Sequence, residues 1–596
     1  MRHSATQREL IDVAQGRTPA DLLIRGGMVA NVYSGEFLQT NIAICKDKIA
    51  YVGEEEHAVG ERTRVIDAEG LYLSPGFIEP HAHPWVLYNP VSYTTKALAL
   101  GTTTIAHDNL FFFLHMGECG FRRMVEDLRQ LPGNNRWLIR LVSQAAYPGE
   151  KEDFHPEALC RLLQMEEAIG TAEVTRWPLL YNGDEQLLEL TRYAKELGKV
   201  VDGHTSGCSY EKLNSLAAAG ISACHEAITA KEALDRLRLG LWTVLRNSSL
   251  RPDFPELIPL IAEGSVPTNR LLMTTDGPHP GFLEEHGCVG GLIRSAVQLG
   301  AAPMQALQMA TINPATYLKL DDQVGGIAPG KRADLLVLPN LRDFRPELVI
   351  SGGEIAAENG RLLLSVPRID WNRYGQKLPF AINRDRLADP DLYPYRPQPT
   401  DRTLPVIHFR SAVITKLVEL EKGRGSQKAD LDLPEGLLWA TLIDRQGTWI
   451  SRGILERFAV RIDGFASTYN TTTHLLAIGR DPRAMAKAAL RVHELGGGIV
   501  LVEDGEILLE IPLPLAGMMI TDPDFSAAVR HHADLLTAMQ QRGYPFHDIL
   551  YTLLFLTCDS LPGLRLTPYG LYEVQSDRIL RAAESLETNP KSPNFQ

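Results

Sequence analysis

Apolar strand-like runs and helical patterns alternate through the middle of the chain, from about residue 76 to residue 317. The runs are short, and the segments between them repeat apolar residues at helical spacing. Regular alternation over about 240 residues is typical of a (β/α)8 barrel, an α/β fold, so we expect such a barrel over 76–317. The clearest strands are 102–108, 137–142, 199–204, 221–226 and 271–276, and the clearest helices are 211–219, 230–239 and 290–299.

Both flanks of the predicted barrel carry brief strands bounded by Gly, Asp or Glu. They follow a short helical pattern at 5–15 and lie at 29–32, 41–44, 48–52 and 64–67, and then, beyond the barrel, within 325–338 and 347–355. Two similar blocks on either side of a long insertion predict one composite β-sandwich. We expect it to be built from 1–75 and 318–366.

The composition changes beyond residue 366. The stretch 367–407 is rich in Pro, Arg and Asp and is predicted to be an extended linker. Strand-like and helical patterns then return, with an Asp504-Gly505 hairpin turn, and predict a C-terminal α+β domain over 408–596. The glycine run 496–498 lacks the Lys-Ser/Thr of a phosphate loop, so it is expected to end the preceding helix.

Composition narrows the class of protein. A chain of 596 residues with 44% hydrophobic and 22% charged residues is an ordinary globular protein of several domains. Its 73 acidic and 60 basic residues leave a net charge of −13, which argues against a nucleic-acid partner. No apolar run of about 18 residues occurs, so we expect no membrane span. The seven cysteines are scattered without a Cys-x-x-Cys pair, which indicates reduced thiols and a cytoplasmic location.

The strongest chemical signal is His81-Ala82-His83, at the end of an extended segment that restarts after a Pro-Gly turn. Residues i and i+2 of a strand point to the same face, so both imidazoles can reach one point. A metal ion is the simplest occupant of that point. A lone His at a strand end is more often structural, but other polar residues also follow predicted barrel strands, where such barrels carry their chemistry: His107, His204, His225, Glu226 and Asp276.

His81, His83, His204, His225 and Asp276 together offer four imidazoles and one carboxylate, ligands that suit zinc, manganese or iron. At these positions the chain resembles the amidohydrolase superfamily of metal-dependent hydrolases. Within that superfamily it is similar to the adenine deaminases over nearly its whole length. The segments that carry the similarity are 202–207, 213–221, 224–226, 275–276, 310–315, 496–500 and 513–517. By this resemblance the C-terminal domain covers the mouth of the barrel.

One residue separates the chain from other members of the superfamily. Hydantoinase-like members bridge two metal ions with a carboxylated lysine, whereas no lysine occurs here between Lys151 and Lys195. Glu173 takes the corresponding place in the adenine deaminase pattern, and a glutamate can bridge two cations with its two oxygens. The resemblance therefore implies two divalent metal ions (Mn, Fe or Zn) per chain, with Glu173 as the bridge. Composition alone would favour a different interpretation, in which Glu173 is an ordinary glutamate on the surface.

The implied reaction is hydrolytic deamination of an aminopurine. Water activated by metal attacks the ring carbon that carries the amine, and Asp276 is expected to accept and pass on the proton. Glu226 or His107 could share this relay, although Glu226 could instead orient His225. Homodimers are expected as well. Two alternatives stay open: a hydrolase that opens a cyclic amide, and a ligand-binding barrel without turnover.

Three departures from the adenine deaminase pattern lie around the expected substrate pocket. Residues 84–89 replace the usual Ile-Glu-Ser-Ser, His107 lies in Ala-His-Asp in place of Pro-His-Glu, and 467–474 replace the usual His-Asp-Ser-His. The substrate is thus adenine or an N6-substituted or otherwise modified aminopurine. Trp85 and Tyr88 could stack on the purine, although packing is the commoner role for either.

Overall fold

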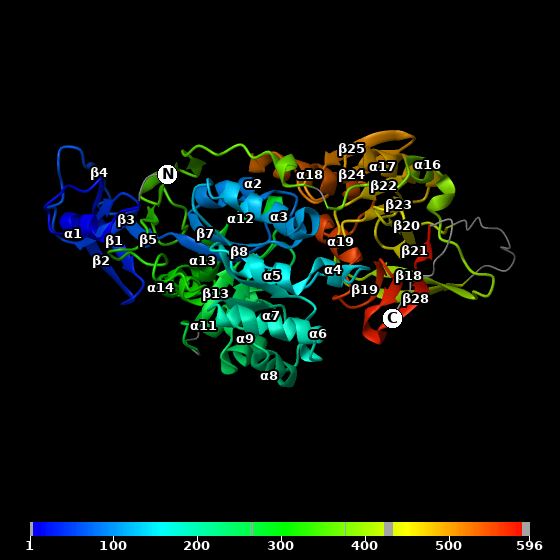
Figure 1. Cartoon of the computed structure of the whole chain (residues 1–596), viewed down its shortest axis with the longest axis horizontal. Helices are drawn as coiled ribbons and strands as arrows, with labels where there is room; N and C mark the ends of the chain where they lie inside the picture. The colour runs from blue at the N-terminus through cyan, green and yellow to red at the C-terminus, as the bar shows by residue number, and fades with distance from the viewer. Residues whose placement is uncertain (1–3, 263, 265, 376, 422–432, 587–596) are drawn as a thin grey trace.

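The computed structural model describes residues 4–262, 264, 266–375, 377–421 and 433–586. The chain forms three parts in a row: an N-terminal sheet, a central barrel and a C-terminal sheet (Figure 1). The outermost parts of the predicted domain ranges, 1–3 and 587–596, and the internal stretch 422–432 lie outside the described residues.

The central part is a parallel eight-stranded barrel, as the alternating pattern predicts. A bridge between Ala82 and Asp276 joins the last strand to the first and nearly closes the sheet. The strands are β6 (Phe77–Ala82), β7 (Thr102–Asp108), β8 (Asn134–Ile139), β9 (Ala168–Val174), β10 (Val200–Gly203), β11 (Ala223–Cys224), β12 (Trp242–Arg246) and β13 (Leu271–Thr274). The main helices are α2 (Pro90–Ala99), α3 (Leu110–Leu128), α5 (Pro156–Leu163), α7 (Glu185–Glu196), α8 (Tyr210–Ala218), α9 (Ala230–Arg238), α12 (Pro280–His286), α13 (Val289–Gln298), α14 (Pro303–Ala310) and α15 (Ile312–Tyr317).

The barrel interior is apolar below its mouth. One small cluster contains a buried residue from each strand, namely Ile78, Ala106, Leu138, Ala172, Val200, Ala223, Val244 and Leu272, and α15 closes it with Ala315 and Tyr317. Because side chains alternate along a strand, the residue two positions after an inward apolar residue also points inward. On β7 that residue is Asp108, and the corresponding residues after β8 and at the end of β12 are Arg140 and Arg246. This register decides which polar groups reach the mouth.

The N-terminal part is a single nine-stranded sheet that both flanks of the barrel build together, as predicted. Its strands are β1 (Leu22–Asn31), β2 (Glu36–Cys45), β3 (Lys48–Gly53), β4 (Arg64–Asp67), β5 (Tyr72–Pro75), β14 (Leu335–Leu338), β15 (Leu348–Ser351), β16 (Glu354–Glu358) and β17 (Arg361–Leu362). Strand β14 pairs antiparallel with β5, which joins the two segments. One core encloses Ile24 and Ile42 together with Leu335 and Ile350, and α1 (Gln7–Ala14) packs beside a second core.

In its described residues, the connector beyond β17 contains only short helical turns, including α16 (Arg384–Leu387). The C-terminal sheet begins at Thr403, slightly before the predicted boundary, and has the order β19-β18-β21-β20-β23-β22-β24-β25. Its strands are β18 (Thr403–Phe409), β19 (Thr415–Glu421), β20 (Leu437–Ile443), β21 (Trp449–Glu456), β22 (Gly464–Ser467), β23 (Leu475–Gly479), β24 (Gly498–Glu503) and β25 (Glu506–Pro512), and β29 (Glu584–Ser585) pairs with β21. A small sheet contains β26 (Leu564–Thr567), β27 (Gly570–Glu573) and β28 (Arg578–Ala582).

Local sequence signals of the C-terminal domain are confirmed. Helix α17 (Pro482–Glu494) ends before Gly496, which has a φ of +73°, so the glycine run terminates a helix as expected. Asp504 and Gly505 both have positive φ and join β24 to β25, as a tight hairpin requires. Two further helices, α18 (Phe525–Gln540) and α19 (Ile549–Leu556), follow.

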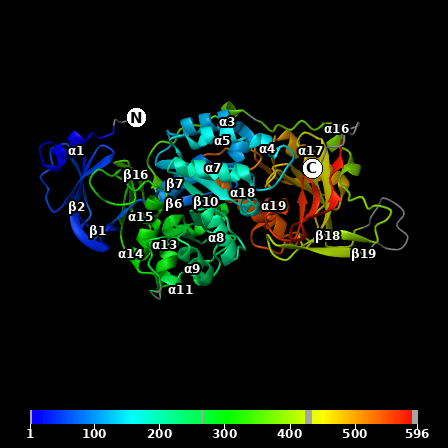
Figure 2. The same ribbon diagram turned by 60° about the horizontal axis from the view of Figure 1, so that its bottom comes forward.

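Helices α18 and α19 contribute to the contact between the C-terminal domain and the barrel. Both views place α19 between the barrel and the C-terminal sheet (Figures 1 and 2). Tyr551 of α19 donates a hydrogen bond to the Gly277 carbonyl beyond β13, and Ser249 of the barrel donates to Asp548 at 3.0 Å. Among the described residues, no helix is long and apolar enough to span a lipid bilayer.

Candidate active site

His81, near the end of β6, and His83, directly after it, point into the barrel mouth. His81 Nδ1 lies 2.7 Å from Asp202 Oδ2, and its Nε2 lies 3.2 Å from His83 Nε2. His83 Nδ1 lies 3.2 Å from Asp108 Oδ2. Both histidines are almost fully buried. In each imidazole, one ring nitrogen faces a carboxylate and the other is directed at a common point.

Glu173 of β9 lies at the centre of the second half of the site. Its Oε2 lies 2.7 Å from His204 Nδ1 and 3.2 Å from His225 Nε2, and its Oε1 lies 3.6 Å from His83 Nε2. One carboxylate thus touches histidines from three strands. Glu173 is buried within a strand, so the surface role that composition favours does not apply.

Asp276, two residues beyond β13, faces both histidines of the first pair. Its Oδ1 lies 2.9 Å from His83 Nε2 and 3.3 Å from His81 Nε2. Its backbone has a φ of +61°, a left-handed conformation that is costly for a non-glycine residue and is found most often at functional sites. Its pKa would rise through burial, but the neighbouring histidines and the Arg246 guanidinium hold it well below the usual range.

Two buried arginines balance the carboxylates. Arg140, which is fully buried, donates to Asp108 at 2.6 Å and to Glu173 Oε1 at 2.7 Å. Arg246 Nη1 lies 2.9 Å from Asp276 Oδ2 and 2.6 Å from Glu226 Oε1. Buried carboxylates with such partners stay ionised, and the mouth of the barrel is therefore a fixed array of charges.

Glu226 lies beside this array rather than at its centre. Arg246 forms an ion pair with its Oε1 at 2.6 Å, and Arg251 donates to its Oε2 at 2.6 Å. Its Oε1 also lies 3.5 Å from a ring nitrogen of His225. Burial would raise its pKa, but the two arginines lower it below the ordinary range, so it remains ionised. The contact with His225 agrees with an orienting role better than with proton transfer.

His107 does not join the group. Its ring nitrogen Nε2 lies 3.0 Å from Asn135 Oδ1, and the ring packs against Trp137 at 5.2 Å between centroids. Burial lowers its pKa to about 4. The alternation along β7 turns His107 outward and the next residue, Asp108, inward, so the structure offers Asp108 where the sequence analysis expected His107.

Four site residues were not identified from the sequence: Asp108, Asp202, Arg140 and Arg246. Each follows or ends an apolar strand run, as the predicted histidines do. Arg246 ends β12, a strand absent from the predicted set, and the run Trp242–Leu245 was the available signal. Charged residues at strand ends are common, and only the closed barrel shows which of them converge.

The array forms one end of a cavity of about 490 Å³ between the barrel and the C-terminal domain. His83, Glu173, His204 and Asp276 line it from the barrel. The opposite wall comes from the C-terminal domain and includes 411–414, Tyr551, Leu554, Phe555 and 560–561. Trp85 also lines the cavity, whereas Tyr88 does not: its ring stacks on Tyr93 at 5.2 Å.

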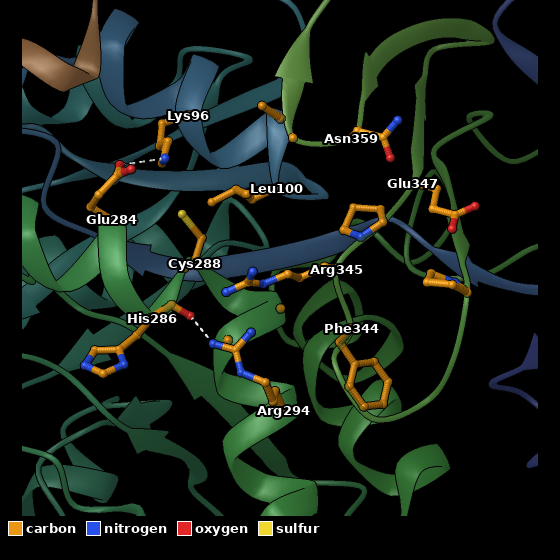
Figure 3. Close-up of a pocket in the computed structure, with 17 residues that line it drawn as sticks. Lys96, Leu100, Glu284, His286, Cys288, Arg294, Phe344, Arg345, Glu347 and Asn359 are labelled. Atoms are coloured by element: carbon orange, nitrogen blue, oxygen red, sulfur yellow. Dashed lines mark hydrogen bonds and ion pairs between the residues drawn. The ribbon is translucent and has the colours of Figure 1, made fainter.

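A second cavity, of about 420 Å³, lies outside the barrel mouth, where α2, α12 and α13 meet the segment after β14 (Figure 3). Lys96 forms an ion pair with Glu284 at 2.8 Å there, and Arg294 donates to the His286 carbonyl at 2.6 Å. None of the converging strand-end groups lines it. The cavity at the barrel mouth is therefore the candidate active site.

Comparison with known proteins gives the same assignment along the whole chain. Residues 72–356 match the Amidohydrolase family, and residues 412–578 match the Adenine deaminase C-terminal domain. The Bacillus subtilis (strain 168) protein YerA is 34% identical over 574 residues, which cover 96% of this chain and 97% of that protein. The chain belongs to the adenine deaminase family. A Moorella thermoacetica protein named adenine deaminase is 32% identical over 587 residues, 95% of this chain and 96% of that protein.

Membership of the adenine deaminase family confirms the resemblance found in the sequence. It also raises the question whether the converging side chains could bind metal ions. Four groups of three His, Asp or Glu residues have ligand atoms within 4.8 Å of one another: His81, Asp202 and His225; His81, His83 and Asp276; Glu173, His204 and His225; His83, Asp108 and Glu173. Within the described chain, both ring nitrogens of His225 are buried without a hydrogen-bond partner. Buried imidazole nitrogens without partners are costly unless a ligand engages them, so these residues fit divalent metal.

Proposed function

We propose that the protein is a metal-dependent hydrolase that converts adenine and water to hypoxanthine and ammonia. The observation that carries the proposal is the buried array of His81, His83, Glu173, His204, His225 and Asp276 at one end of the cavity between the barrel and the C-terminal domain, in a chain of the adenine deaminase family. Relatives named adenine deaminase extend over nearly the entire chain, including the C-terminal domain.

We infer that this array would hold two divalent ions (Mn, Fe or Zn), with Glu173 shared between them. The two oxygens of Glu173 face different histidines, Oε1 toward His83 and Oε2 toward His204 and His225, which supports a bridging role. Divalent metal, when bound, supplies Lewis-acid activation of the attacking water. Arg140 fixes Glu173 through Oε1 and the backbone carbonyl, so that the carboxylate cannot rotate away.

The protein side of the reaction is proton transfer and charge stabilisation. Asp276 is ionised, lies in the cavity and can take the proton from the attacking water. The same carboxyl gives that proton to ring N1, and it then carries the proton of the new C6 hydroxyl group to the exocyclic amine as the C6–N bond breaks, so that the oxopurine and ammonia leave. Arg246 holds the second oxygen of Asp276, which fixes the direction of the first, and Glu226 in turn fixes Arg246.

The cavity also supports a wider substrate range. Trp85 lies in the segment 84–89 that departs from the family pattern, two residues beyond His83, and its ring lies 4.7 Å from that of His83. A cavity of about 490 Å³ leaves room beside a bicyclic base. We therefore include N6-substituted or otherwise modified aminopurines among the substrates, with the corresponding amine as the leaving group.

The decisive experiment measures ammonia release by manganese-loaded protein from adenine, other aminopurines and a few cyclic amides, with amine release measured for N6-methyladenine. Release from any aminopurine supports the proposal, and the ranking shows what the altered cavity selects. If only cyclic amides react, or if nothing reacts while metal is bound, the proposal fails in favour of a cyclic-amide hydrolase or a binding protein.

We further propose that the protein is a homodimer and is located in the cytoplasm. The seven cysteines are all free, which suits a reducing compartment. Light scattering of the purified protein tests the dimer directly.

A further inference from the structure

The cavity contains one buried amide that the chemistry described above does not use. Gln144 lies in the loop after β8 and lines the cavity together with His83, Glu173 and Asp276. Its side chain is only 5% exposed, and within the described part of the chain its Oε1 atom is buried without a hydrogen-bond partner. An unpaired buried acceptor is costly, so something bound in the cavity must satisfy it.

The loop that carries Gln144 is held firmly on both sides. The Ser143 backbone N–H donates to Glu150 Oε1 at 3.0 Å, and the Ala146 N–H donates to Asp559 Oδ2 at 2.8 Å. Glu150 is fixed in turn by Arg176, which lies 2.6 Å from its carboxylate. Groups with fixed backbones and buried side chains bind ligands with little loss of entropy.

The bond from Ala146 to Asp559 also locates Gln144 within the cavity. Asp559 belongs to the C-terminal domain, and the next two residues, 560–561, line the same cavity. Gln144 therefore lies toward the side closed by the C-terminal domain, whereas the metal-binding array lies at the strand ends of the barrel. A base that reacts at C6 over that array directs its opposite edge toward Gln144.

The opposite edge of a free purine base has the pattern that an amide complements. It presents N3 as an acceptor beside N9–H as a donor, and a glutamine side chain offers one acceptor and two donors from adjacent atoms. Glutamine forms such paired hydrogen bonds with adenine in other complexes. A substituent on N9 removes the donor and adds bulk on the same edge.

Resting on the proposed deaminase function, we propose that Gln144 is a specificity-determining residue that binds the N3/N9–H edge and selects free purine bases over N9-substituted ones. Its Oε1 accepts from N9–H, and its Nε2 donates to N3. The substrate class of the site is then an unsubstituted aminopurine base, and nucleosides are rejected.

The test compares kcat/KM for adenine and 9-methyladenine in manganese-loaded wild type and Gln144→Leu. We expect the variant to lose roughly 10-fold to 100-fold on adenine and less than about 3-fold on 9-methyladenine, so that the preference for the free base collapses. Gln144→Glu keeps the acceptor for N9–H and loses the donor to N3, so its loss on adenine should be intermediate. Gln298→Leu, an exposed glutamine at the end of α13, is the matched control.

Equal losses on the two substrates, or an unchanged kcat/KM for adenine, would overturn the role of Gln144. The inference and the proposed function fail separately when binding of adenine is also measured by calorimetry. If wild type releases no ammonia yet Gln144→Leu weakens adenine binding at least 10-fold, the residue assignment stands and the deaminase proposal falls. If wild type and Gln144→Leu bind adenine with equal affinity, Gln144 does not bind the base, whatever the rate of turnover.

Discussion

A stacked histidine pair joins the barrel to the C-terminal domain and should make their contact sensitive to acid. His279 at the start of α12 and His532 of α18 have ring centroids 4.1 Å apart and nearly parallel planes. Burial, followed by the effect of neighbouring histidines, lowers the pKa of each to about 4. The buried Asp548 carboxylate opposes this effect at His532 without cancelling it.

The magnitude follows from the difference between the folded and unfolded pKa values. A fall from 6.5 to about 4 is 2.5 units, and at about 1.36 kcal/mol per unit each histidine contributes on the order of 3 kcal/mol. The unfolded chain takes up protons below a pH of about 6.5, whereas the folded pair resists protonation until about 4. The stability is therefore fully present above pH 6.5 and is lost as the pH falls toward 4.

His532→Gln removes the proton that the unfolded chain takes up at residue 532 between pH 6.5 and pH 4. We expect the variant to lose about 3 kcal/mol less stability than wild type between pH 7 and pH 4. For a chain of 596 residues that unfolds as one unit, this is a change of roughly 2 °C in the Tm difference, at about 0.8 °C per kcal/mol. Scanning calorimetry over that range measures it, and His155→Gln, an exposed histidine directly before α5, is the control. Parallel Tm curves for wild type and His532→Gln would refute the reasoning.

Three further predictions concern the barrel mouth. Asp276→Asn should reduce kcat by about 10²-fold to 10⁴-fold while much of the metal stays bound, and near-normal turnover would remove Asp276 from proton transfer. Arg140→Leu leaves the buried Asp108 and Glu173 carboxylates without their cation and should cost about 3–5 kcal/mol in metal-free protein, with a smaller loss once metal is added; equal losses in calorimetry would contradict this compensation. His107→Phe should leave kcat/KM for adenine within about 3-fold in a steady-state assay, because the ring faces away from the cavity; a loss comparable to that of Asp276→Asn would restore His107 to the relay.

Much of the fold could be predicted because the barrel is built from strong local patterns. The predicted strand 102–108 is β7 to the residue, and the predicted helix 230–239 differs from α9 by one residue. The end of α17 and the hairpin between β24 and β25 were equally clear, since Gly496 and Gly505, both with positive φ, lie at these two points. The composite N-terminal domain depends on the long-range pairing between β5 and β14, which joins its two segments into one sheet.

The site was harder to predict because it depends on register rather than on residue type. His107 and Asp108 are adjacent, and only the inward position of Ala106 shows that the carboxylate reaches the mouth. No sequence pattern pointed to Gln144, because the loop that carries it is positioned by a hydrogen bond from Ala146 to Asp559, over 400 residues away in the chain. Charged pairs such as Arg246 with Glu226 likewise form only when separate strands converge.

The cavity has a floor from the barrel strands and a roof from residues 411–414 and 547–561. The groups that react are thereby encoded at the strand ends of the barrel, whereas a large part of the wall that shapes the substrate space is encoded in a separate stretch of the chain. Substitutions in the roof can alter which base fits without moving any group that activates water. Such a division gives a lineage of enzymes a route to new substrates in which the hydrolytic step is inherited intact.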